Sequence, residues 1–415
     1  MFQKPRGTCD WFGENINDYN YVCDCLKSVA KLYNFKQINT PTFEQLELFI
    51  KNIGESTDVI KKEIYDFTDK SGRRLALRPE GTAGVIRAYV ENKMYGNQNY
   101  VEKLFYIMNV FRYDRPQSGR YREFNQFGIE YLKTSSYLDT VECISFAYQI
   151  LNKLNIKSFK LKINNLGSFE SRKKWVEVLK EYFRKYKSEL TQDSIERIEI
   201  NPLRILDDKV DSKKDFVINA PKLEKYLSDK EKQEFKLILK SLKDLGISYE
   251  VDNSLVRGLD YYTKTVFEFV STLEVLGKST IIGGGNYSNL IKETGGPDYE
   301  GLGFGLGIER IIIALKQENE LKKEINKDSY LVAVENEKDN FLGMEICLKL
   351  RQKGFETFIL NEENKKAKLA KYAINNNIAN IIWINDNTEK NHKIILEKMQ
   401  DSSKKEININ ELLKD

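Results

Sequence analysis

Four arginines of one short segment, Arg112, Arg115, Arg120 and Arg122, have the side chains of an anion-binding site. Phe124 follows them. A guanidinium group forms paired hydrogen bonds to phosphate oxygens, and an aromatic ring can stack on a planar base. The segment therefore favours nucleotide binding. A solvated hairpin whose arginines pair with nearby acids is the alternative, because surface ion pairs are common and weak.

The residues around these arginines predict two strands joined by a loop. Aromatic and β-branched residues fill 104–111 and 124–132, and Pro116, Ser118 and Gly119 lie between them. Side chains alternate between the two faces of a strand. If the second strand runs unbroken from the loop, one face carries Arg120, Arg122, Phe124, Gln126 and Glu130.

An acid is fixed on a turn near residue 80. Pro79 ends a strand that begins at Arg74, Gly81 permits a tight turn, and Thr82 is expected to cap a helix that begins at Ala83. Glu80 can then bind the ammonium group of a ligand. Its alternative role is to stabilise the N-terminus of the helix, with Thr82 acting only as the cap.

Two further segments combine glycine with arginine. In Arg257-Gly-Leu-Asp-Tyr-Tyr-Thr263, glycine lets the backbone beside the arginine approach a ligand, and a strand is predicted over 261–270. This suits an anion next to a flat aromatic ligand, or equally a buried edge strand with tyrosines in the core. Glycines at every second position from Gly301 to Gly307 predict a flat strand against which a planar base can lie, followed by an apolar helix that Arg310 opens.

These segments together resemble a known family. Phe111-Arg-Tyr-Asp-Arg-Pro-Gln-Ser-Gly-Arg-Tyr-Arg-Glu-Phe124 is similar to the second signature motif of class II aminoacyl-tRNA synthetases, in the form carried by histidyl-tRNA synthetases. The segment at Arg257 resembles the signature specific to that family, and the alternating glycines with Arg310 resemble the third class II motif. The similarity runs from Gly7 nearly to the C-terminus.

The resemblance implies an α+β catalytic domain with the antiparallel class II synthetase sheet, a helical insertion and a C-terminal α/β anticodon-binding domain. The catalytic domain is expected over residues 1–325, interrupted by the insertion at 168–249, with the anticodon-binding domain over 326–415. A βαβαβ rhythm from about Asp328 agrees with the last assignment. A helix over 18–33 and a strand over 35–44 that contains Pro41 resemble the first class II motif, which implies a homodimer.

The resemblance also implies an activity and residue roles. The chain would activate L-histidine with ATP, giving histidyl-adenylate and pyrophosphate, and transfer the histidyl group to the 3′ end of tRNA(His). Mg²⁺ is expected to be held through the ATP phosphates, with no protein ligands. Arg112 and Arg257 would be catalytic. The histidine-binding residues would be Glu80, Thr82, Gln126, Glu130, Arg257, Tyr261 and Tyr262; the ATP-binding residues Arg112, Arg120, Phe124 and Arg310; and the residues at the tRNA acceptor end Arg115, Gln117 and Arg122.

Several positions depart from the usual family pattern, among them Glu300-Gly301, which replaces a proline-containing turn. Asn286 and Ser288 stand where arginine and aspartate are common, and Asn125 stands where histidine is frequent. No role is carried over to Asn286 or Ser288.

Composition excludes several other classes of protein. The 415 residues carry 66 basic and 62 acidic side chains, so any nucleic-acid site is a local patch and not a global field. Five cysteines without Cys-x-x-Cys spacing indicate reduced thiols in a cytoplasmic protein. His392 is the only histidine, which argues against histidine-based catalysis or a zinc site. No apolar run has the length of a membrane span.

Two other functions share the resemblance. A non-catalytic regulatory paralogue would bind histidine, but such proteins lack the intact Arg257 segment and the C-terminal domain. An RNA-binding sensor would tolerate the loss of Arg112, Arg257 and Arg310. This chain retains all of these features.

Overall fold

A computed structural model describes residues 2–54, 57–96, 100–206, 208–259, 261–277, 279–318, 321, 326–360, 366–385, 388 and 393–413. The chain forms two compact units, Met1–Leu321 and Lys322–Asp415. Asp260, within the arginine–tyrosine segment, and His392 lie outside the described residues.

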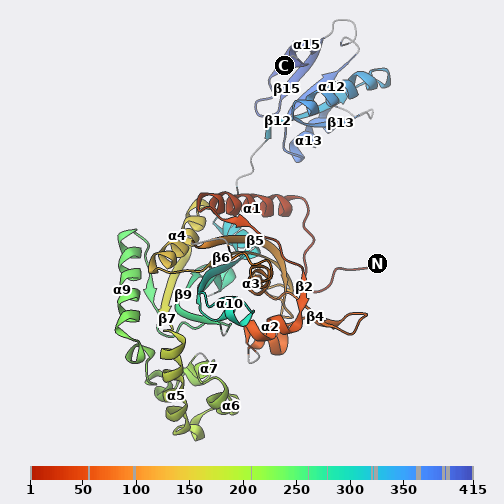
Figure 1. Cartoon of the computed structure of the whole chain (residues 1–415). Helices are drawn as coiled ribbons and strands as arrows, with labels where there is room; N and C mark the ends of the chain where they lie inside the picture. The colour runs from red at the N-terminus through yellow and green to blue at the C-terminus, as the bar shows by residue number, and fades with distance from the viewer. Residues whose placement is uncertain are drawn as a thin grey trace. The chain divides into compact units, whose positions relative to one another are not determined.

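The described part of the first unit is built on an eight-stranded, mostly antiparallel sheet (Figure 1). The strands predicted at 104–111 and 124–132 are confirmed as β5 and β6. The edge pairs β1–β5 and β7–β8 are parallel, and the other neighbours are antiparallel. The order across the sheet is β1 (Lys36–Gln37), β5 (Glu102–Phe111), β6 (Glu123–Leu132), β11 (Gly301–Gly307), β10 (Thr280–Tyr287), β9 (Tyr262–Ser271), β7 (Phe159–Asn165) and β8 (Glu250–Val251).

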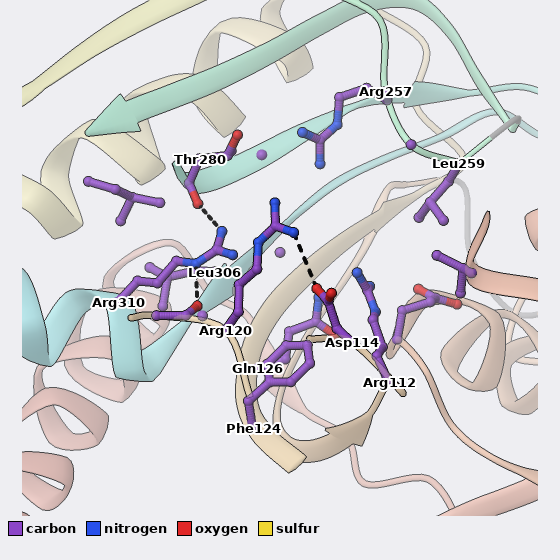
Figure 2. Close-up of a pocket in the computed structure, with 18 of the residues that line it drawn as sticks. Arg112, Asp114, Arg120, Phe124, Gln126, Arg257, Leu259, Thr280, Leu306 and Arg310 are labelled. Carbon is purple, nitrogen blue, oxygen red and sulfur yellow. Dashed lines mark hydrogen bonds and ion pairs between the residues drawn. The ribbon is translucent and has the colours of Figure 1, made fainter. Parts of the chain in front are cut away.

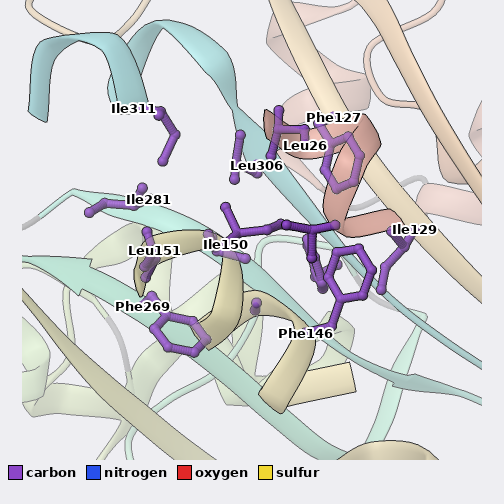
Figure 3. Packing of buried hydrophobic residues seen from close by; sticks show 14 of the residues in the cluster. Leu26, Phe127, Ile129, Phe146, Ile150, Leu151, Phe269, Ile281, Leu306 and Ile311 are labelled. Carbon is purple, nitrogen blue, oxygen red and sulfur yellow. The ribbon is translucent and has the colours of Figure 1, made fainter. Parts of the chain in front are cut away.

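One face of this sheet is buried under helices. Phe127 and Ile129 of β6 and Phe304 of β11 point into a core that also contains Leu26 and Phe146 (Figure 3). Burial of such large apolar side chains contributes about 1.5–3 kcal/mol each. The helices on this core are α1 (Glu14–Leu32), α4 (Tyr137–Lys153), α9 (Asp229–Asp244) and α11 (Ile308–Gln317).

The opposite face presents the alternate residues of the same strands. Gln126, Gly128 and Glu130 lie between the buried apolar positions of β6, and the glycines of β11 face the same way because Gly303 pairs with Glu130 and Gly305 with Gly128. Part of this face is covered by α3 (Thr82–Glu91) and α10 (Leu290–Glu293), which pack on Tyr106 and Tyr287. The remainder of this face of the sheet can contribute side chains to a ligand-binding site.

The predicted strand over 35–44 is wrong as a single element. The structure has two short strands there, β1 in the large sheet and β2 (Phe43–Gln45) in a small antiparallel sheet with β4 (Arg74–Leu77) and β3 (Asp66–Thr68). Pro41 lies between them and cannot donate a backbone hydrogen bond to a ladder. Helix α2 (Leu46–Ile53) follows β2 directly.

After β7 the chain forms a helical segment with a core of its own. Trp175, Leu179 and Phe183 of α5 are buried against Ile198 and Leu203. Figure 1 shows α5, α6 and α7 projecting together from the end of the sheet, and α9 alongside β7. The helices of this segment that precede α9 are α5 (Phe169–Arg184), α6 (Gln192–Ile200), α7 (Leu203–Leu206) and α8 (Asp215–Ile218).

One carboxylate joins the two ends of this segment. Glu231 of α9 accepts hydrogen bonds from the Ser168 backbone N–H and the Ser171 hydroxyl (2.8 Å) at the start of α5, and from the Ser228 backbone N–H (2.7 Å) at the start of α9. Burial opposes ionisation, but the hydrogen bonds from Ser228, Ser168 and Ser171 outweigh it and lower the pKa of Glu231 to about 2. A single side chain therefore supports the N-cap residues of both helices, Ser168 and Ser228.

The second unit has the predicted βαβαβ order and continues beyond it. Its described strands form a five-stranded sheet, in which β12 is parallel to β13 and β14 while β15 and β16 add antiparallel pairs that were not predicted. No helix among the described residues of the chain is both long and apolar enough to cross a membrane. The elements are β12 (Asn326–Val334), α12 (Asn340–Gln352), β13 (Glu356–Leu360), α13 (Lys366–Asn375), β14 (Ile378–Ile384), β15 (Lys393–Lys398), β16 (Lys404–Asn408) and α15 (Ile409–Leu413).

Candidate active site

A cavity of about 390 Å³ lies on the open face of the large sheet (Figure 2). Its lining comes from segments far apart in the sequence, including the turn before α3, strands β6 and β11, and the segment before β9. Ten of the residues proposed from the sequence line it together: Glu80, Thr82, Arg112, Arg120, Phe124, Gln126, Arg257, Tyr261, Tyr262 and Arg310.

The turn before α3 is held by Glu80. Its carboxylate accepts hydrogen bonds from the backbone N–H groups of Thr82 (2.6 Å) and Ala83 (2.7 Å), so Glu80 caps the helix. The prediction that Thr82 is the cap is wrong, because α3 begins at Thr82 itself and its side chain does not cap. Gln126 fixes the turn from β6 by accepting a 3.0 Å hydrogen bond from the Gly81 N–H. Burial raises the pKa of Glu80.

Glu130 lies just behind the cavity and not on its lining. Its side chain is buried, and its Oε2 accepts a 2.7 Å hydrogen bond from the hydroxyl of Tyr287. Burial raises the pKa of Glu130 to about 8, even though the Tyr287 hydrogen bond favours the ionised form. A Cβ at Gly303 would lie 2.4 Å from Oε2, so glycine is needed there to make room for the carboxylate.

Two tyrosines form an aromatic wall beside this carboxylate. The ring centroids of Tyr261 and Tyr262 are 4.6 Å apart, and those of Tyr261 and Tyr287 are 5.8 Å apart. Burial raises the pKa of both Tyr261 and Tyr262, so their hydroxyls stay protonated and can donate hydrogen bonds.

The arginines of the loop between β5 and β6 enter the cavity differently. Arg112 donates a 2.8 Å hydrogen bond from Nε to the Pro79 carbonyl, and its guanidinium lies 5.7 Å from the Phe124 ring centroid. Arg120 pairs with Asp114 at 3.3 Å. Arg112 is thus attached to the Glu80 turn, and Arg120 to its own loop.

Arg310 connects the start of α11 to two other segments. Its Nε donates a 2.8 Å hydrogen bond to the Gly119 carbonyl, and its Nη1 donates to the Thr280 carbonyl. Burial, followed by the positive charges of Arg120 and Arg112, lowers the pKa of Arg310 to about 10. The arginine side chains in this cavity repel one another, so a bound anion would relieve that repulsion.

Arg257 lies flat against strand β10. A Cβ at Gly283 would be 2.4 Å from its Nη1, so the guanidinium occupies the space that a larger residue would fill. Its Nη1 donates to Glu268, and the Tyr262 ring centroid lies 5.5 Å from its Cζ. Its Nε is buried and has no hydrogen-bond partner in the described part of the chain.

Three proposed residues lie elsewhere. The expectation that Arg122 shares a face with Arg120 and Phe124 is wrong, because those two line the first cavity and Arg122 does not. Strand β6 begins only at Glu123, and the Arg122 N–H donates to the Gly7 carbonyl. The Arg122 guanidinium stacks 3.9 Å from the Tyr113 ring centroid and lines a second hollow of about 320 Å³ together with Arg115. Gln117 is exposed at the tip of the loop.

This geometry accompanies extensive similarity to known proteins. A family profile described as histidyl-tRNA synthetase matches residues 10–311. A histidine–tRNA ligase of Malacoplasma penetrans is 46% identical over 413 residues, covering 99% of this chain and 97% of that protein. The chain belongs to the histidyl-tRNA synthetase family.

Two more family members agree with this assignment. A histidine–tRNA ligase of Ureaplasma parvum is 48% identical over 397 residues, covering 95% of this chain and 94% of that protein. The crystal structure of apo histidyl-tRNA synthetase from S. aureus superposes with a TM-score of 0.84 at 32% identity, covering 100% of this chain and 99% of that one. The class II synthetase fold expected from the motifs is confirmed.

Two of the departures from the usual histidyl-tRNA synthetase pattern, Asn125 and Ser288, form hydrogen bonds. Asn125 donates to Glu309 from its backbone N–H (2.8 Å) and from Nδ2 (2.9 Å). The hydroxyls of Ser288 and Thr263 are 2.7 Å apart. The first arrangement holds Glu309, which lines the cavity beside Arg310.

Several residues at the site were not identified from the sequence, among them Asp114, Glu268 and Tyr287. The family resemblance did not point to these three, and each acts here as a hydrogen-bond or ion-pair partner of a proposed residue. Glu268 had a signal, because it lies an even number of positions after Tyr262 on one strand and so tends to face the same side. The hydrogen bond from Tyr287 to Glu130 had no such signal, because the two residues are far apart in the sequence.

Proposed function

We propose that this chain is a histidine–tRNA ligase, which forms histidyl-adenylate from L-histidine and ATP and then transfers the histidyl group to the 3′ end of tRNA(His). The observation that carries the proposal is one cavity lined by four arginines, with a buried carboxylate of raised pKa directly behind it. Such a cavity suits a polar amino acid beside a phosphate chain.

The histidine site is proposed around Glu80 and Glu130. Glu80 and Thr82 would hold the ammonium group of the substrate, while Gln126, Tyr261 and Tyr262 would surround its imidazole. Imidazole both donates and accepts hydrogen bonds, and a carboxyl group with a pKa of about 8 can do either near neutral pH. A polar pocket of this kind rejects ligands without matching groups by roughly 10⁴–10⁵, because its own groups would stay unpaired.

The ATP site is proposed across the arginines. Arg112 and Arg257 would bind the α-phosphate and Arg120 the outer phosphates. Arg310 and Phe124 would enclose adenine, and a desolvated guanidinium on a π-face contributes about 1–2 kcal/mol. The described residues contain no group of three His, Cys, Asp or Glu side chains that could hold a metal ion, and Asp114, one of the acids on the cavity lining, is paired with Arg120. These residues fit Mg²⁺ that is carried by the phosphates of ATP, where it would neutralise their charge.

The chemical step then needs positioning and charge stabilisation. The histidine carboxylate attacks the α-phosphate, and negative charge develops on the phosphorus oxygens as pyrophosphate leaves. Fixed guanidinium groups in a largely buried cavity stabilise that charge without reorganising. Arg112 and Arg257 are each held by protein groups before substrate arrives, which favours their role as the catalytic cations.

The remaining roles follow the family. Arg115, Gln117 and Arg122 are proposed to contact the tRNA acceptor end, which is supported by the second hollow and by the exposure of Gln117. The second unit is proposed as the anticodon-binding domain. A homodimer is proposed through the first motif, where the exposed ring of Phe43 makes an edge-to-face contact with the exposed ring of Phe67 of β3. The enzyme would act in translation in the cytoplasm.

ATP–pyrophosphate exchange tests the proposal directly. Purified protein is assayed with each of the twenty amino acids separately, without tRNA. Exchange with histidine alone, followed by charging of tRNA(His), is the expected result. If all twenty give no exchange while histidine still binds by calorimetry, the chain is a non-catalytic histidine-binding regulator or RNA-binding sensor. Light scattering measures whether the protein is a dimer.

A further inference from the structure

Glu268 of β9 binds Arg257 of the cavity and the hydroxyl of Thr280. One carboxylate oxygen accepts from Nη1 of Arg257, and the other accepts a 2.7 Å hydrogen bond from the hydroxyl of Thr280. The backbone carbonyl of Thr280 in turn accepts from Nη1 of Arg310. Figure 2 shows Arg257, Arg120 and Arg310 directed into the cavity, with Thr280 beside Arg310.

The sheet is built to allow this arrangement. Glu268 lies opposite Gly283 in the β9–β10 register, and the missing side chain of Gly283 leaves the space that the Arg257 guanidinium occupies. The side chains of Arg257 and Glu268 are only 17% and 16% exposed, so the pair is largely shielded from water. A shielded ion pair of this kind is far stronger than an exposed one and fixes the orientation of the guanidinium.

We propose that Glu268, oriented by the Thr280 hydroxyl, is a positioning residue that aims the Arg257 guanidinium at the α-phosphate. This inference rests on the proposed function. Nη1 is engaged by Glu268, which holds the guanidinium against Gly283 on the cavity lining. Glu268 makes no contact with the substrate in this role and acts only through Arg257.

The electrostatics give this role a distinctive kinetic signature. Glu268 carries a negative charge near the site proposed for the phosphates, so its charge opposes ATP binding in the ground state. Removing that charge misdirects Arg257 but also removes the repulsion. The rate of adenylate formation should therefore fall without any weakening of ATP binding, whereas a general structural defect would impair both.

The experiment compares Glu268→Gln with wild type in histidine-dependent pyrophosphate exchange. We expect kcat to fall about 10- to 100-fold, since small misplacements of a catalytic group have effects of this size, with the KM for ATP unchanged or lower. Thr280→Val, which keeps the carbonyl used by Arg310, should lower kcat by a smaller factor, and Thr280→Ser should restore it. Glu274→Gln, an exposed glutamate beyond the same strand, is the matched control.

A double-mutant cycle separates positioning from structure. In an Arg257→Ala background, followed by single-turnover adenylate formation, Glu268→Gln should have no more than a twofold effect. A full additional loss in that background overturns the inference, as does a Glu268→Gln kcat within twofold of wild type or a raised KM for ATP. Wild-type protein without histidine-dependent exchange would instead overturn the proposed function, so the two failures are distinguishable.

Discussion

Glu130→Gln is predicted to stabilise the first unit at alkaline pH while impairing histidine activation. Burial raises the pKa of Glu130 from 4.5 to about 8. Between these values the folded chain binds more protons than the unfolded chain, so the free energy of unfolding falls as the pH rises through this range. Glutamine has nearly the same shape, can accept the Tyr287 hydrogen bond, and carries no ionisable group.

The size of the effect follows from the two pKa values. At about 1.4 kcal/mol per pH unit, the interval between 4.5 and about 8 corresponds to roughly 5 kcal/mol over the whole titration. Between pH 5 and pH 8 the wild type would lose about 3 kcal/mol through this group, and the variant would not. The stability difference between variant and wild type should therefore grow by about 3 kcal/mol in favour of the variant over this range.

Urea unfolding at several pH values measures this difference. Glu123→Gln, on the same strand, reports the effect of the same substitution where the carboxylate accepts a hydrogen bond from Asn109 and is only half-buried. Pyrophosphate exchange by Glu130→Gln should show a raised KM for histidine. A variant-to-wild-type stability difference that stays constant from pH 5 to pH 8 would refute the assignment of a raised pKa to Glu130.

Three more predictions concern single positions. Arg257→Lys should lower the adenylation rate about 10- to 100-fold while histidine affinity stays within a few-fold, because an ammonium cannot replace a guanidinium fork. Rapid-quench kinetics measures the rate and calorimetry measures the affinity. Unchanged turnover would remove Arg257 from the mechanism. Glu231→Gln should lower the stability of the helical segment by about 1–2 kcal/mol, since it weakens two helix caps. Because the pKa of Glu231 is lowered to about 2, the wild type should be more stable than the variant above about pH 4.5, and this difference should disappear as the pH falls towards 2. Acid unfolding followed by circular dichroism measures the difference. A stability difference that does not change with pH contradicts the prediction. Gly303→Ala should destabilise the sheet and abolish exchange, because its Cβ would lie 2.3 Å from the Ile129 carbonyl oxygen. Gly307→Ala, with its nearest atoms at 3.9 Å, should keep wild-type stability. Equal stability of the two variants in urea unfolding would refute the steric argument.

The strands and helices that position the site were largely predictable from local sequence. Residues 104–111 and 124–132 have the aromatic and β-branched composition of strands, and both form strands in the structure. Prediction of the site was wrong in two places, one decided by a neighbouring residue and one by a distant residue. Thr82 looked like the helix cap, but the carboxylate of Glu80 takes that place. Arg122 was expected beside Arg120, but its N–H donates to the Gly7 carbonyl and its guanidinium lies on the Tyr113 ring.

The sequence by itself determined which residue types gather at the site, because the three signature segments carry the arginines, tyrosines and glycines in fixed order. It also determined the family, since similarity extends over nearly the whole chain. Only the tertiary structure decided which of those residues are buried, which form ion pairs and how their pKa values shift. Burial beside Tyr287, between strands distant in sequence, raises the pKa of Glu130 to about 8. The orientation of the Arg257 guanidinium depends on Glu268 and Gly283, which lie opposite each other on strands β9 and β10. Burial and ion pairing depend on these long-range contacts, which spacing along the chain does not reveal.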